Sequence, residues 1–98
     1  MNSKIETYIG FAIKKGSVVF GCDSIETCRK KIKLILRTKS LSENSVKFLE
    51  NIAKKRSCRI AEIDDYDLLK KRNCKALAIC DSSLANAIIE NITLVAGR

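Results

Sequence analysis

The chain has 98 residues, of which 46% are hydrophobic and 31% are charged, which is enough for one small domain with one core. Its 19 Lys and Arg residues exceed its 11 Asp and Glu residues, and the net charge of +8 favours polyanionic partners such as RNA, DNA or an anionic membrane surface. No apolar run approaches the roughly 18 residues of a membrane span, and the first residues lack the pattern of a secretory signal, so we expect a cytoplasmic protein without a membrane partner.

The first predicted element is a helix with Ser3 as its N-cap, because Glu6 follows at the spacing of a capping box. Ile5 and Ile9 continue at helical spacing, and Gly16 ends the helix. A short strand follows at Ser17–Phe20, where β-branched residues are frequent.

Gly21 interrupts this strand, and Asp23 or Ser24 can cap a second helix directly after it. One interpretation of Gly21 is a turn that requires a positive φ, which by itself explains a glycine. The other is a close approach of the backbone to a ligand. The local sequence does not separate the two interpretations.

The second predicted strand, Ile32–Arg37, places Leu34 and Leu36 on one face and Ile35 on the other, so both faces of its sheet should be covered. The remaining predicted elements, in chain order, are a helix that follows a second capping box at Ser40–Glu43 and ends in Lys54–Arg56, a strand at Cys58–Ile63, a short helix capped by Asp64 or Asp65 that runs to Arg72, a strand at Lys75–Cys80, and a last helix capped by Asp81 or Ser82.

Helices that alternate with short apolar strands predict an α/β fold. We expect a three-layer α/β/α sandwich around a four-stranded mixed sheet, formed by a single domain over residues 1–98. Residues 93–98 are expected to be a flexible tail.

Four clusters of basic residues fall at the carboxyl ends of predicted helices, where the helix dipole alone favours cations. A surface for a polyanion is the alternative explanation for each of them. The clusters are Lys14–Lys15, Arg29–Lys31, Lys54–Arg56 and Lys70–Arg72.

Arg37 and Lys39 differ from these clusters, because they follow a strand and precede the amino end of a helix, where the dipole opposes a cation. Contact with a phosphate is one interpretation, because a helix amino end and basic side chains together form an anion site. A solvated loop charge is the other.

Chemistry at a catalytic or metal centre is not expected. The chain has no histidine, and its five cysteines form no C-x-x-C pair, so neither a zinc site nor a Cys–His nucleophile is predicted. No cofactor motif is present, and the acidic cluster at Asp64, Asp65 and Asp67 is typical of a helix amino end. We therefore expect a non-enzymatic protein with reduced thiols: Cys22, Cys28, Cys58, Cys74 and Cys80.

Two segments carry a resemblance to a known family. YIGFAIKKGSVVFG at Tyr8–Gly21 and KIKLILRTKSLSENS at Lys31–Ser45 are similar to the opening helix, basic turn and first two strands of the ribosomal L-seven-Ae superfamily, in particular its small bacterial YlxQ-like branch. The resemblance extends from about Tyr8 to Ile92. It implies an α/β sandwich and binding to RNA, because that superfamily contains ribosomal and ribonucleoprotein core proteins that bind kink-turn RNA.

The resemblance also implies where RNA would bind, and where this chain departs from the family. The family glycine matches at Gly21, but its Asn, Glu and Lys positions fall on Asp23, Ser24 and Thr27. A second motif, Leu-Gly-x-x-x-Gly, falls on Leu68–Asn73 with both glycines replaced. The next loop, at Asn73–Lys75, is the family's second RNA-facing region, so the departures imply weakened or altered recognition.

We therefore predict a non-enzymatic RNA-binding protein that contacts ribosomal or other structured RNA. The alternative is a protein-interaction module that kept the fold and lost specific RNA recognition. The predicted RNA-binding residues are Gly21, Asp23, Ser24, Thr27, Lys30, Lys31, Lys33, Arg37, Lys39, Asn73, Cys74 and Lys75. Most of the affinity is expected from Arg37, Lys39 and the basic run 29–33 rather than from the turn at Gly21.

Overall fold

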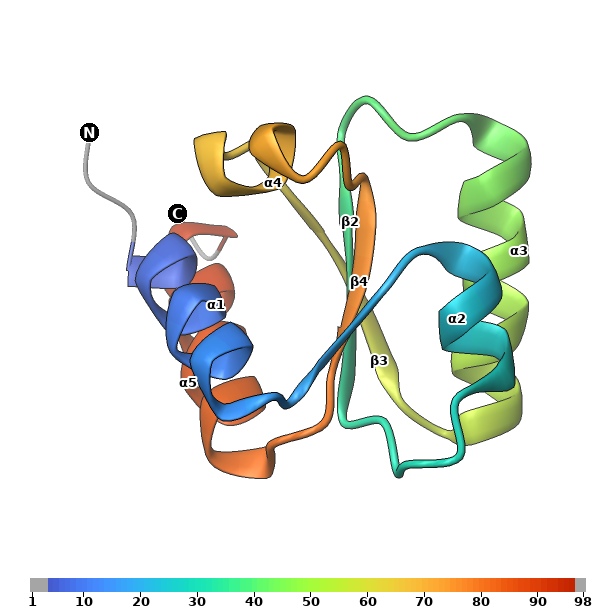
Figure 1. The fold of residues 1–98 in the computed structure, drawn as a ribbon, viewed down its shortest axis with the longest axis horizontal. Helices are drawn as coiled ribbons and strands as arrows, with labels where there is room; N and C mark the ends of the chain where they lie inside the picture. Colours follow the sequence, from blue (N-terminus) through green and yellow to red (C-terminus); the bar gives the residue numbers. More distant parts are fainter. Residues whose placement is uncertain (1–3, 97–98) are drawn as a thin grey trace.

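The computed structural model describes residues 4–96 and confirms the α/β class (Figure 1). The strands lie within two residues of the predicted bounds. In chain order the elements are α1 (Lys4–Lys15), β1 (Val18–Phe20), α2 (Cys22–Thr27), β2 (Leu34–Thr38), α3 (Glu43–Arg56), β3 (Arg59–Ile63), α4 (Asp67–Lys71), β4 (Ala76–Ile79) and α5 (Ser82–Ala96).

The four strands form one mixed sheet in the order β1-β4-β2-β3. β2 and β3 are parallel, and β4 is antiparallel to both of its neighbours, β1 and β2. Consequently β1, β2 and β3 all end where β4 begins. We call this side of the sheet, next to Gly21, Thr38, Asp64 and Lys75, the upper edge, and the opposite side, next to Ser17, Lys33, Arg59 and Cys80, the lower edge (top and bottom of Figure 1).

Helices cover both faces of the sheet, which confirms the three-layer sandwich. α1, α5 and α4 lie on one face, and α2 and α3 lie on the other (Figure 1). Leu34 and Leu36 are fully buried in the first of these cores, whereas Ile35 is fully buried in the second. The predicted alternation along β2 is therefore confirmed, and burial on both sides explains why β2 is an almost continuous apolar run.

The N-cap of α3 is Ser42, so the prediction of a capping box at Ser40–Glu43 was wrong by two residues. The Ser42 side chain accepts a hydrogen bond from the Ser45 amide at 3.3 Å. The Ser40 hydroxyl instead lies 3.1 Å from the Thr38 hydroxyl and donates to Asp65 at 2.7 Å. Ser40 therefore belongs to the loop between β2 and α3, where it joins that loop to the segment after β3.

The start of α2 also differs from the prediction. Gly21, with φ of 89°, is the N-cap residue, and no side chain caps the helix. Asp23 and Ser24 lie inside the first turn, and Thr27, the last residue of α2, donates its hydroxyl proton to the Asp23 carbonyl at 3.1 Å. Because a φ near +90° is accessible mainly to glycine, Gly21 turns the chain from strand to helix without a capping side chain.

The prediction that Asp64 or Asp65 caps α4 was also wrong, because Tyr66 is its N-cap residue. Both carboxylates make contacts with the loop between β2 and α3 instead. At α5 the prediction of Asp81 as a cap is confirmed, since its carboxylate accepts the Leu84 amide at 2.9 Å.

Two of the sequence predictions concern the ends of the chain. Ser3, the predicted first N-cap, lies outside the described residues. At the other end α5 is helical through Ala96, so the segment expected to be a tail from residue 93 is part of a helix over its first four residues, and 97–98 lie outside the described residues.

Candidate nucleic-acid interface

The structure divides the predicted RNA-binding residues between the two edges of the sheet. The Lys33 amide bonds to the Ile79 carbonyl at 2.9 Å at the lower edge, and the Thr38 amide bonds to the Lys75 carbonyl at 2.9 Å at the upper edge. Five residue steps along β2 separate Lys33 from Thr38, which corresponds to about 16 Å. The upper group is Gly21, Asp23, Ser24, Arg37, Lys39, Asn73, Cys74 and Lys75, and the lower group is Lys30, Lys31 and Lys33, with Thr27 at the end of α2 that leads to it.

The turn before α2 and the loop after α4 lie side by side at the upper edge. The Gly21 amide donates to the Ala76 carbonyl at 2.9 Å, and the Cys74 thiol donates to the same carbonyl at 2.9 Å. Burial raises the pKa of the Cys74 thiol, so this group is protonated at neutral pH. The two regions that the family resemblance assigns to RNA are thus in direct contact.

The backbone of both regions is in the left-handed half of conformational space. A Cβ added at Gly21 would have no atom within 4 Å, so its φ of 89° explains the glycine and its outer side is open to a ligand. Asn73, which occupies the position of the second family glycine, has φ of 52°. Asparagine tolerates this conformation better than most residues, so the loop keeps a glycine-like backbone without the glycine.

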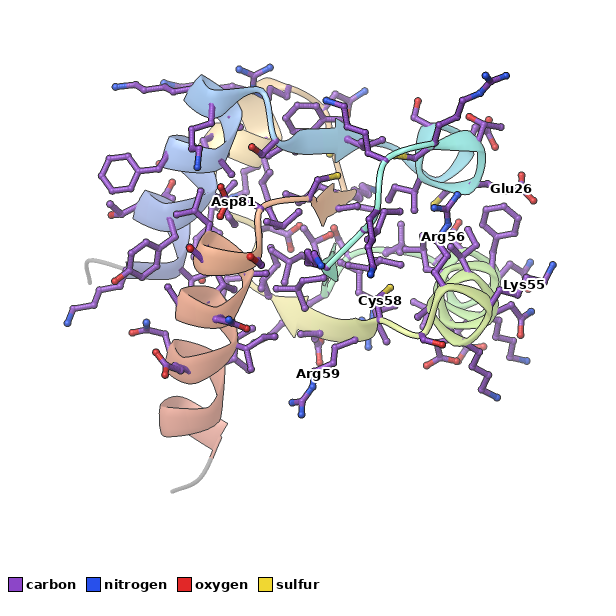
Figure 2. The ribbon with its side chains drawn as sticks, turned by 90° about the horizontal axis from the view of Figure 1, so that it is seen from below. Glu26, Lys55, Arg56, Cys58, Arg59 and Asp81 are labelled. Atoms are coloured by element: carbon purple, nitrogen blue, oxygen red, sulfur yellow. The ribbon has the colours of Figure 1, made fainter. Side chains whose placement is uncertain are left out.

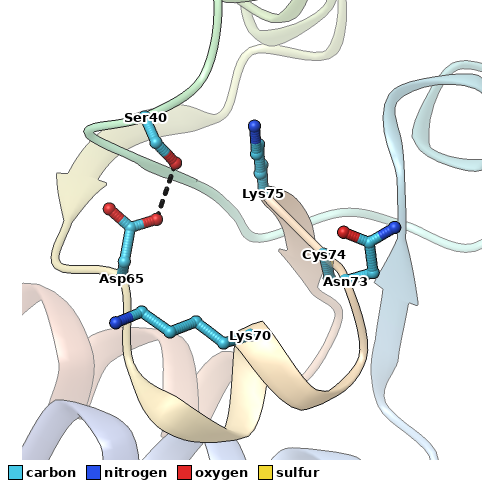
Figure 3. A pocket seen from close by; sticks show the side chains of 6 residues that line it. All are labelled: Ser40, Asp65, Lys70, Asn73, Cys74 and Lys75. Atoms are coloured by element: carbon cyan, nitrogen blue, oxygen red, sulfur yellow. Dashed lines mark hydrogen bonds between the residues drawn. The ribbon is translucent and has the colours of Figure 1, made fainter.

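A hollow of about 380 Å³ lies beside this loop (Figure 3). Its walls come from the segments 40, 65, 70 and 73–75, and the Ser40–Asp65 hydrogen bond closes one side. Lys70 on α4 and Lys75 before β4 bring two ammonium groups to it. Neither forms an ion pair within residues 4–96. Sequence reasoning had assigned Lys70 only to a helix-end cluster, and only the fold places it beside Lys75.

Arg37 and Lys39 have acidic neighbours that the sequence did not indicate. The Arg37 guanidinium lies 3.8 Å from the Glu62 carboxylate, its partner in the parallel register of β2 and β3. The Lys39 ammonium lies 3.1 Å from Asp64, whose hydrogen bond and charge raise the pKa of Lys39. A phosphate at either side chain would compete with these carboxylates.

Acidic residues gather at the upper edge as a whole. Six basic residues there, Arg37, Lys39, Lys70, Lys71, Arg72 and Lys75, face an equal number of acidic residues, Asp23, Glu43, Glu62, Asp64, Asp65 and Asp67. The lower edge has ten basic residues, Lys14, Lys15, Arg29, Lys30, Lys31, Lys33, Lys54, Lys55, Arg56 and Arg59, against only Glu26 and Asp81. The positive charge of the chain is therefore concentrated at the lower edge.

One of these lower-edge cations has a structural role. Arg56, in the last turn of α3, donates to the carbonyls of Cys28 at 2.6 Å and Glu26 at 3.1 Å, and reaches the Lys30 carbonyl at 3.5 Å (Figure 2 shows Arg56 beside Glu26). The Glu26 and Cys28 carbonyls lie at the end of α2, where carbonyls lack partners within the helix, and the Lys30 carbonyl lies in the following loop. Arg56 therefore holds the loop between α2 and β2 against α3.

Thiols, possible metal ligands and possible membrane spans are three further features of residues 4–96. The five cysteines are half-buried free thiols. Within residues 4–96, no three Cys, Asp or Glu side chains come together as metal ligands would. None of the helices in this part of the chain has the length and apolar character needed to cross a membrane.

Comparisons with known proteins show a shared fold. No protein-family model matches the chain, and no curated protein sequence is significantly similar to it. A protein of unknown function from Bacillus halodurans C superimposes with a TM-score of 0.83 over 93% of this chain and 98% of that one, at 10% sequence identity. An archaeal translation termination factor, aRF1, matches 76% of this chain with a TM-score of 0.54 and 20% identity, and the match covers 23% of that factor.

Proposed function

We propose that the protein is a non-enzymatic RNA-binding module of the ribosomal L-seven-Ae kind, which binds structured RNA, kink-turn-like or ribosomal, through its upper edge. The observation that supports this most is the contact between the two regions that the resemblance assigns to RNA, joined by the hydrogen bond from Gly21 to Ala76 at 2.9 Å. Residues more than 50 positions apart are thereby presented as one surface.

The chemistry of this surface fits a bent or looped RNA better than a uniform duplex. The exposed backbone at Gly21 allows a close approach, and Lys70 and Lys75 supply charge for phosphates on either side of the hollow. The balancing carboxylates repel phosphate, so shape would select the RNA and the affinity would be modest.

A titration with labelled RNA tests this proposal. A hairpin that contains a kink-turn and a straight hairpin of equal length are compared by fluorescence anisotropy at several salt concentrations. We expect tighter binding of the kinked hairpin, and a slope of log K against log salt that falls by about 2 in Lys70→Gln/Lys75→Gln. Lys4→Gln removes one charge from an exposed residue of α1 and should keep the wild-type slope. Absence of binding to both hairpins at low salt would refute the proposal.

A second candidate function is a protein-interaction module, and two observations favour it. The upper edge has as many acidic as basic residues, and Phe11 on α1 leaves 50% of its surface exposed. An exposed aromatic side chain is common in the centre of protein interfaces. Pull-down from lysates with and without nuclease discriminates between the candidates, because protein partners that persist after nuclease, and are lost in Phe11→Ser, support the interaction module.

A further inference from the structure

We propose that the lower edge is a second surface for RNA phosphates, so that one chain holds two segments of RNA at opposite edges of its sheet. This inference rests on the proposed function, since it assumes that the upper edge binds RNA. It differs in its chemistry, because the lower edge has a large excess of cations over carboxylates and would contact the backbone of the RNA regardless of sequence.

The strand order places lower-edge cations in a row. Lys33 precedes β2, and Arg59 begins β3 as the register partner of Leu34. At β4 and β1, the Cys80 amide bonds to the Ser17 carbonyl at 2.8 Å, which brings the end of α1 to the same edge. The four neighbouring strands span about 14 Å. Cations from the end of α1, the loop before β2, the end of α3 and the start of β3 therefore lie along the lower edge.

The basic loop between α2 and β2 is held in place rather than free. Arg56 donates to the carbonyls of Cys28 and Lys30, on either side of Arg29. Figure 2, seen from the lower side, shows Lys55, Arg56 and Arg59 on this edge. A backbone ordered before binding reduces the conformational entropy that a ligand must remove, so these side chains are prepared for a polyanion.

Local explanations account for only part of the lower-edge charge, namely the cations in the last turns of α1 and α3. Arg56 already occupies the carbonyls at the end of α2, so Arg29, Lys30 and Lys31 are not required there. Arg59 begins a strand, where no helix dipole acts. Among the described residues, the exposed cations Arg29, Lys30, Lys31, Lys55 and Arg59 form no ion pair. Of the two acidic residues, Asp81 is paired with Lys15 and caps α5.

The composition of the edge favours RNA over a membrane surface. Amphipathic surfaces that bind in the plane of a bilayer interface bury large apolar side chains beside their cations. Within the described chain the one exposed large hydrophobic residue is Phe11, on α1 rather than in the basic loop. Cations without apolar neighbours are suited to phosphates that stay in water.

Native mass spectrometry tests the inference by counting chains and RNAs in each complex. With a labelled 20-nucleotide RNA hairpin in excess, we expect one chain with two RNAs. Lys30→Gln/Lys31→Gln should weaken the second binding step about tenfold at moderate salt and lower its salt slope by about 2, with the first step unchanged. The control Lys4→Gln, on an exposed residue of α1, should retain both steps, and circular dichroism checks that all variants fold.

The possible outcomes separate this inference from the proposed function. A single RNA per wild-type chain at every excess, or two unchanged steps in Lys30→Gln/Lys31→Gln, would overturn the second surface while leaving the proposed function intact. Absence of any RNA complex would instead refute the proposed function. If the variant lost binding to phosphatidylserine vesicles but kept both RNA steps, the lower edge would be a membrane surface and the inference would be wrong.

Discussion

The guanidinium of Arg56 lies 2.6 Å from the carbonyl oxygen of Cys28 and joins the end of α3 to the end of α2. The sequence offered the dipole of its own helix or a polyanion surface as explanations for Arg56, whereas its side chain bonds to carbonyls at the end of the neighbouring helix. The same contact keeps the basic loop that follows Cys28 in a fixed position.

Replacement of Arg56 by Ala should therefore destabilise the protein. Hydrogen bonds from a charged donor contribute about 1.5–3 kcal/mol, and the carbonyls of Glu26 and Cys28 would lose this partner. We expect a loss of about 2 kcal/mol in the free energy of unfolding, measured by urea denaturation. Lys55→Ala, at the exposed neighbouring position, should change it by less than about 0.5 kcal/mol. Equal effects of the two substitutions would show that the contact contributes little.

Gly21→Ala should also destabilise the fold, by roughly 1–2 kcal/mol, because φ of 89° is unfavourable for a residue with a Cβ. Gly10→Ala is the matched control. A Cβ there also meets no atom within 4 Å, but Gly10 lies inside α1, where alanine is preferred by about 1 kcal/mol. Thermal denaturation should thus shift in opposite directions for the two variants, and a shift in the same direction would contradict the role assigned to the Gly21 turn.

The stability of the protein should fall in acid partly through Asp81. The hydrogen bond from Lys15 lowers the pKa of Asp81, with the Leu84 amide contributing in the same direction. Since the folded state holds the carboxylate ionised more readily than the unfolded state, this stabilisation is present at neutral pH and is lost as the pH falls below about 4. Asp81→Asn should have a flatter dependence of unfolding free energy on pH between 5 and 3. Lys15→Gln should flatten the curve as well, and an unchanged slope in both variants would exclude this pair as a source.

Removal of the carboxylates that neutralise the upper edge should strengthen RNA binding. Glu62→Gln/Asp64→Asn frees Arg37 and Lys39 from their ion pairs, so both cations become available to phosphate. We expect severalfold tighter binding of the kinked hairpin at low salt and a steeper salt slope. Glu6→Gln/Glu90→Gln changes the net charge equally on α1 and α5, at carboxylates that do not pair with Arg37 or Lys39, and should have a smaller effect. Equal effects would mean that net charge, rather than the upper edge, controls affinity.

The elements of this fold could be predicted from sequence because their signals are local. The alternation of Leu34, Ile35 and Leu36 indicated a strand buried on two faces, and Gly21 marked the junction of strand and helix. The helix caps were less predictable. Ser40 and Asp65 were predicted as caps, but their side chains hydrogen-bond to each other across 25 residues of sequence. The local sequence does not indicate such a contact.

RNA binding stays a prediction. The tertiary structure decided where the basic residues that would contact RNA lie. The sequence by itself determined the net charge of +8, the helices and strands, and the two faces of β2, because composition and periodicity depend on neighbouring residues. The order β1-β4-β2-β3 was settled by packing between distant segments. It placed Lys33 and Arg37 at opposite edges although four positions separate them, and the parallel register of β2 and β3 set Arg37 beside Glu62.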